Sequence, residues 1–154
     1  ASADVLEKVF EGKDDADVYY GETLLVDAEG REIGFRRLSP PPSLTWKDFR
    51  HGMLVSHQSF IASRRVSKRY DLRYRFSADY EWCLNALQKA KEIHNTGRVL
   101  SKFREGGLTR QNILPGLRER FAIMVKYFGR ASAIMAHFRI LPRFLGFWIR
   151  HGWF

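Results

Sequence analysis

The sequence SHQSFIASRRVSKRYDLRYRFSADYEW, residues 56–82, combines a short apolar segment, a basic loop and the start of an amphipathic helix. Residues 60–62 (Phe-Ile-Ala) are flanked by polar residues, which predicts a short buried strand. From Asp79 onward the apolar positions follow the spacing i, i+3, i+4 and i+7 that marks one face of a helix. The residues with this spacing are Tyr80, Cys83, Leu84 and Leu87. We therefore expect a strand, a loop and a helix, in that order.

Asp79 falls in the first turn of the predicted helix, together with Glu81. One interpretation is a helix cap, because Asp is among the residues preferred at helix starts, where negative charge is favourable. The other is a general base, since a carboxylate at a helix start beside a basic loop can take a proton from a hydroxyl nucleophile. Periodicity alone does not separate the two interpretations.

Several motifs, in this order along the chain, resemble the acceptor-side half of family 2 glycosyltransferases. They are ADVLEKVF at 3–10, DVYYGE at 17–22, HQSF at 57–60, YRFSADYEW at 74–82 and FREGGLT at 103–109. The resemblance covers about residues 3–110. It implies an α/β chain that forms part of a GT-A fold, the fold of nucleotide-diphospho-sugar transferases.

The resemblance also implies a function. A sugar would pass from a nucleotide-sugar donor to a hydroxyl of a glycan or lipid-linked acceptor, with Asp79 as the catalytic base. Substrate-binding roles fall to His57, Arg75, Glu81, Gly106 and Gly107. From the residues alone, His57 is more typical of a hydrogen-bonded structural histidine, whereas the Gly-Gly pair fits an ordinary turn equally well. The chain divides into an acceptor-side part at 1–112 and a basic, aromatic, helical extension at 113–154.

Family 2 enzymes also have a nucleotide-sugar half that carries an Asp-x-Asp motif. In this chain the Asp-x-Asp spacing occurs only within residues 14–17, between a predicted helix and a predicted strand. We therefore expect the chain to be a fragment or one part of a split enzyme, with a donor-half chain as a partner. A divalent cation, Mg²⁺ or Mn²⁺, is implied for the complete enzyme, with ligands mostly outside this chain. No cluster of residues here has the spacing of a metal site.

The basic loop within residues 56–82 allows three interpretations. Its cations are Arg64, Arg65, Lys68, Arg69, Arg73 and Arg75, interleaved with aromatic residues. They could form a solvated surface, a phosphate-facing rim beside the donor diphosphate, or a nucleic-acid surface on which aromatic rings stack with bases. No RNA-binding consensus accompanies them, so we do not expect nucleic acid as the partner.

The composition of the chain limits these interpretations of its fold and its partners. The 154 residues are 45% hydrophobic, enough for a folded domain, and carry 26 Lys and Arg against 17 Asp and Glu, giving a net charge of +9. That charge predicts an anionic partner. The single cysteine, Cys83, lies on the apolar face of the predicted helix, so we expect it in the core. A chain with one cysteine forms no internal disulfide, which suggests that the protein works in a reducing compartment. We expect no signal peptide and no membrane span.

Residues 120–154 contain arginines, lysine and many aromatic residues but no acid. This mixture fits a helix that lies at a membrane interface, or equally one that packs on the domain. The first interpretation predicts a cytoplasmic protein held peripherally at the inner face of the cell membrane. The alternative to an enzyme is a basic module that binds RNA or an anionic membrane.

The remaining pattern predicts a helix at 4–11, a strand at 17–20 that ends at Gly21, and a hairpin of 23–27 with 32–36 that turns at Gly30. It further predicts a short helix at 44–51 and a helix at 117–128 that starts after Pro115-Gly116. A short strand at 92–95, closed by Gly97, precedes a separate apolar segment at 99–103.

Overall fold

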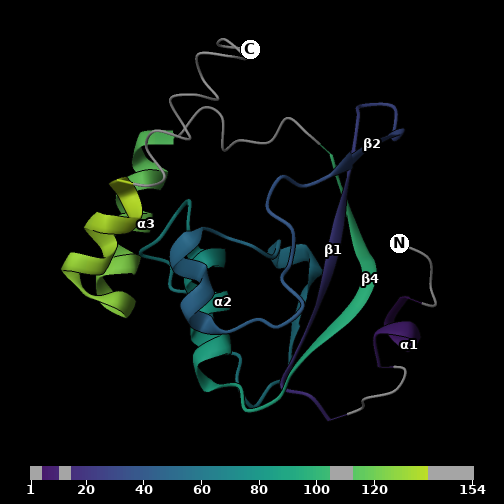
Figure 1. The fold of residues 1–154 in the computed structure, drawn as a ribbon, viewed down its shortest axis with the longest axis horizontal. Coiled ribbons are helices and arrows are strands. Elements are labelled where there is room, and N and C mark those ends of the chain that lie inside the picture. Colours follow the sequence, from purple (N-terminus) through teal and green to yellow (C-terminus); the bar gives the residue numbers. More distant parts are fainter. Residues whose placement is uncertain (1–4, 11–14, 105–112, 139–154) are drawn as a thin grey trace.

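The structure is a computed structural model that describes residues 5–10, 15–104 and 113–138 (Figure 1). Its helical elements are α1 (Val5–Phe10), the 3-10 helices η1 (Trp46–His51) and η2 (His57–Ser59), α2 (Ala78–Lys89) and α3 (Ile113–Phe128), with further helical turns at 130–138.

A small mixed sheet lies at the centre of the fold. The central strand β1 (Val18–Val26) pairs antiparallel with β2 (Glu32–Phe35) and β3 (Phe60–Ala62), and parallel with β4 (Ile93–Arg104). β4 follows β1 along its length, so β2 and β3 must share the other edge of β1, one beyond the other. The α/β class predicted from the sequence is confirmed.

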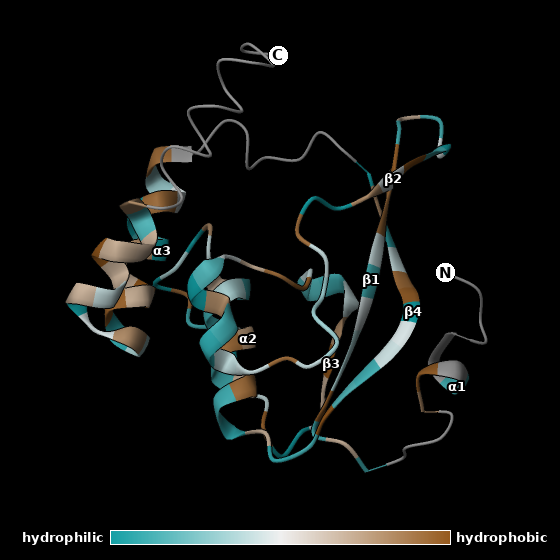
Figure 2. Ribbon diagram, viewed as in Figure 1, coloured by the Kyte–Doolittle hydropathy of each residue, from teal (hydrophilic) through white to brown (hydrophobic). Residues whose placement is uncertain are grey.

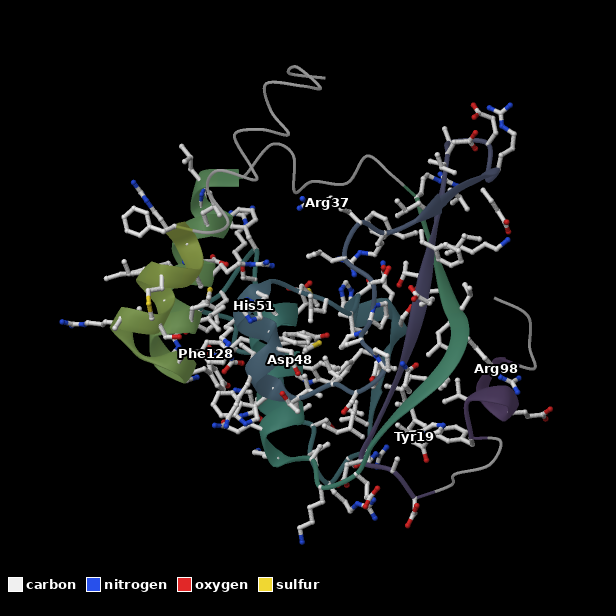
Figure 3. All side chains as sticks on the ribbon, in the orientation of Figure 1. Tyr19, Arg37, Asp48, His51, Arg98 and Phe128 are labelled. Carbon is white, nitrogen blue, oxygen red and sulfur yellow. The ribbon has the colours of Figure 1, made fainter. Side chains whose placement is uncertain are left out.

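Helices cover both faces of the sheet. Val18 and Tyr20 point into the main hydrophobic cluster, which also contains the buried residues of η1, α2 and α3. Tyr19, one residue between them, points to the opposite face and packs with Val9 of α1. Figure 3 shows Tyr19 and Arg98 on the side of the sheet where α1 lies. The larger core therefore lies between the sheet and α2.

Local patterns predicted several elements correctly. Phe60–Ala62 forms β3, and Gly30 turns the hairpin of β1 and β2 with φ of 84°. The predicted face of α2 is buried throughout: its members Tyr80, Cys83, Leu84 and Leu87 are at most 2% exposed. Thr45 precedes η1, and its N–H and hydroxyl both donate to the Asp48 carboxylate, as expected for a capped helix.

The predictions at Gly21 and Gly97 were wrong, because neither glycine ends a strand. Gly21 lies inside β1, where a Cβ would collide with the Arg98 carbonyl oxygen and lie 2.7 Å from Thr96 Oγ1. It is therefore required by the close approach of β4. Gly97 has φ of 62° and lies where the β1–β4 register shifts, so β4 continues past it as one strand.

The start of α3 was also predicted wrongly, because the helix begins at Ile113 and includes Pro115. Proline fits there because the first-turn N–H groups of a helix have no partner within the helix. Ile123 and Met124 of α3, with Ala133 and Ala136 of 130–138, belong to the main cluster. The described part of residues 113–154 therefore belongs to the same hydrophobic core as the described residues that precede it.

Candidate active site

Asp79 is the second residue of α2, and the start of this helix is held from α3. The backbone N–H groups of Arg75, Phe76 and Ser77 donate to the Glu119 carboxylate at 2.9, 2.8 and 2.9 Å. The hydroxyl of Ser77 is turned away and donates to the Gly116 carbonyl at 3.2 Å. Glu119 therefore anchors the segment that leads into α2, up to the N-cap residue Ser77, which no local sequence signal indicated. Within the first turn of α2, Asp79 itself accepts the backbone N–H of Tyr80, so Asp79 keeps part of a capping role.

The two oxygens of Asp79 have separate partners. Oδ1 accepts the N–H of Tyr80 at 2.7 Å, and Oδ2 lies 3.2 Å from His57 Nδ1. Both side chains stay accessible, with 32% of Asp79 and 42% of His57 exposed. The structure thus brings together two of the residues that the resemblance predicted, from η2 and α2.

Asp79 is ionised at neutral pH. Burial alone would raise the pKa of Asp79, but the hydrogen bonds from His57 and from the Tyr80 N–H outweigh it. Together with the electrostatic effects of His57 and Arg120, these hydrogen bonds lower the pKa of Asp79 below its ordinary value. The carboxylate is therefore free to accept a proton, with an orientation set by its two partners.

Two arginines and a second carboxylate interact electrostatically with one another and with Asp79. Arg120 of α3 lies over the ring of Tyr80, with Cζ 4.5 Å from the ring centroid. Arg36, which follows β2, donates to the Met53 carbonyl at 3.2 Å. Burial and the charge of Arg120 lower the pKa of Arg36, whereas Glu22 and Asp79 act to raise it. Arg36 therefore lies within electrostatic reach of all three groups.

Glu22 of β1 is more enclosed than a residue at a solvated sheet edge. Burial raises its pKa, and the positive charge of Arg36 only partly opposes this. Its Oε2 atom is buried, and within the described residues it has no hydrogen-bond partner. Neither Arg36 nor Arg120 was selected from the sequence. These residues are separated in the chain, so only the fold brings them near Asp79.

Glu81 lies in the interior instead. Its side chain is fully buried, and Oε1 accepts from Lys68 Nζ at 2.7 Å, Lys126 Nζ at 2.8 Å and Tyr127 Oη at 2.8 Å. Burial would raise the pKa of Glu81, but these hydrogen bonds outweigh it and lower the pKa. In this position Glu81 links the basic loop, α2 and α3, and its side chain is not presented to a substrate.

The basic loop is partly neutralised within the chain. Arg65 pairs with Asp17 at 3.2 Å, Lys68 with Glu81, and Arg73 with Asp71 at 2.7 Å. Arg75 is exposed, and its guanidinium lies 5.6 Å from the centroid of the Phe76 ring. The internal pairs leave fewer cations for a phosphate backbone. Gly106 and Gly107 lie outside the described residues.

Three further points concern the cysteine, metal-binding groups and membrane-spanning helices. Cys83 is fully buried and burial raises its pKa, so the prediction of a core cysteine is confirmed. Within the described ranges, no group of three or more His, Cys, Asp or Glu side chains could hold a metal ion. In the same ranges, no helix has the length and apolar character to cross a membrane.

Comparison with known proteins gives no match: no protein-family model, no curated protein and no solved structure is significantly similar to this chain. Fold and site together define an α/β protein with an accessible, histidine-paired carboxylate beside two arginines.

Proposed function

We propose that this chain is the acceptor-side part of a glycosyltransferase similar to family 2, with a partial GT-A fold. The observation that carries the proposal is the Asp79 carboxylate, ionised, one-third exposed and oriented through both oxygens. The resemblance places the catalytic base of the family at this residue. The nucleotide-binding half lies outside these 154 residues.

In the proposed reaction, Asp79 Oδ2 takes the proton of the acceptor hydroxyl as the hydroxyl oxygen attacks the anomeric carbon of the donor sugar. The bond from that carbon to the nucleoside diphosphate breaks, and the diphosphate leaves with the bonding electron pair. His57 acts as a positioning residue, because its Nδ1–H bond to Oδ2 fixes the carboxylate. The described residues do not fit a divalent cation, so no step is assigned to one here.

We also propose that the protein attaches to the cytoplasmic face of the membrane, close to a lipid-linked acceptor. Ile134, Met135 and Phe138 are 45%, 62% and 72% exposed and lie within one helical turn of each other. Figure 2 shows apolar residues along α3 and the turns that follow it. Exposed apolar side chains, in a segment (residues 120–154) that contains cations and no acid, favour a membrane interface.

The proposed activity can be tested in permeabilised cells that express the protein from its own gene. Radiolabelled UDP-, GDP- and dTDP-sugars are supplied one at a time, and label is counted in the lipid and polymer fractions. We expect one donor to label a product that a strain without the gene does not make. Equal labelling of both strains with every donor would contradict the proposal.

A further inference from the structure

Arg36 and Arg120 approach the Asp79 site from different parts of the chain, and each is held in place. Arg120 rests on Tyr80, which is fully buried, stacks on Phe49 at 5.8 Å and donates its hydroxyl to the Phe49 carbonyl at 2.7 Å. The guanidinium of Arg120 therefore lies on a rigid aromatic surface.

Arg36 is attached to the same segment of backbone. Its Nη2 donates to the carbonyl of Met53, one residue beyond Gly52, whose N–H donates to Phe49 at 3.0 Å. The residues from Phe49 to Met53 thus support both cations, one through the Tyr80 ring and one through a carbonyl. Both arginines are half-buried, so water screens their mutual repulsion incompletely.

The nearby acids Glu22 and Asp79 act on these arginines through their charge but do not form ion pairs with them. Within the described residues, neither guanidinium forms an ion pair with a carboxylate. The carboxylate of Asp79 is engaged by His57 and the Tyr80 N–H. Arg73, by contrast, forms two hydrogen bonds to Asp71. Arg36 and Arg120 therefore keep N–H donors available for an external partner.

We propose that Arg36 and Arg120 form an oxyanion-binding site beside Asp79, which holds a phosphate group of a substrate. Guanidinium groups are suited to this role because their planar forks match phosphate oxygens. The assignment of the phosphate to a substrate rests on the proposed function, but anion binding itself does not. The phosphate could belong to the nucleotide-sugar donor or to a lipid-linked acceptor.

Calorimetry of the full chain with sodium pyrophosphate at low ionic strength tests the site. We expect R36Q and R120Q each to weaken binding about tenfold or more, because each removes a charged donor. The matched control R73Q removes an arginine already bound to Asp71 and should leave binding unchanged. D79N removes a neighbouring negative charge and should bind pyrophosphate as tightly as the wild type or more tightly.

A measurement on the wild-type chain guards against variants that do not fold. In ¹H–¹⁵N NMR spectra, pyrophosphate should shift the Nε–Hε signals of Arg36 and Arg120 and leave that of Arg73 in place. Unshifted signals, or equal loss of affinity in R36Q, R120Q and R73Q, would overturn the site.

Two further ligands identify the source of the phosphate. Binding of UDP more tightly than farnesyl phosphate assigns the site to the donor, and the reverse order assigns it to the acceptor. Failure of the site is distinct from failure of the function. If D79N transfers sugar at the wild-type rate while R36Q loses pyrophosphate, the site stands and the proposed base is wrong.

Discussion

Replacing Glu119 with alanine should loosen the segment that leads into α2, because one carboxylate accepts the backbone N–H groups of three consecutive residues there, 75–77. A hydrogen bond to a charged group contributes about 1.5–3 kcal/mol. Glu119 is half-buried, so water replaces part of what is lost. We therefore expect E119A to lower the free energy of unfolding by about 2–3 kcal/mol.

That loss corresponds to a fall of about 4–12 °C in Tm for a chain of this size. Thermal unfolding followed by circular dichroism measures it, and hydrogen exchange should show reduced protection of the Phe76 and Ser77 amides. E119Q should be milder, since a glutamine oxygen in the Oε2 position keeps the two donors Phe76 and Ser77. The control E29A removes an exposed partner of Arg31 and should change stability by less than about 0.5 kcal/mol. If E119A and E29A have the same Tm, Glu119 does not anchor the segment before α2.

Three other predictions test the interior of the fold and the proposed membrane surface. E81A should destabilise the chain by about 1–3 kcal/mol in urea unfolding, because it removes the buried carboxylate that Lys68, Lys126 and Tyr127 share, while water can reach both lysines; a loss below about 0.5 kcal/mol would contradict the interior role. G21A should lower stability by about 1–3 kcal/mol, since its Cβ would collide with the Arg98 carbonyl; unchanged unfolding would place β4 further from β1. M135S and F138S should each reduce co-sedimentation with anionic vesicles without lowering Tm, because both side chains are mostly exposed; unchanged sedimentation would remove the proposed membrane surface.

The elements predicted correctly from the sequence are those set by local patterns. The spacing of Tyr80, Cys83, Leu84 and Leu87 defines the buried face of α2, and Gly30 between two apolar runs defines a hairpin. Gly21 was misread because its role depends on β4, which lies far along the chain. A glycine that ends a strand and one that admits a neighbouring backbone look the same in sequence.

The site was predicted only in part for the same reason. The resemblance selected Asp79 and His57, and the fold brings them to 3.2 Å. It also selected Glu81, but the lysines and tyrosine that enclose Glu81 come largely from α3. Arg36, Arg120 and Glu119 had no signal in sequence, because each acts on residues more than a dozen positions away.

The most direct test of the central claim is the pH dependence of sugar transfer by wild type, D79N, H57Q and the control D71N, measured with the donor identified in permeabilised cells. Because the pKa of Asp79 is lowered below its ordinary value, the wild-type carboxylate should stay ionised in mild acid, and protonation should remove activity only at a more acidic pH than an ordinary aspartate would require. H57Q removes the hydrogen bond that lowers this pKa, so its acid limb should move to higher pH. D79N should lose about 10²-fold or more in rate at every pH, while D71N, which changes an aspartate bound to Arg73 in the loop, should keep the wild-type profile. A D79N rate equal to that of D71N would contradict the assignment of Asp79 as the base.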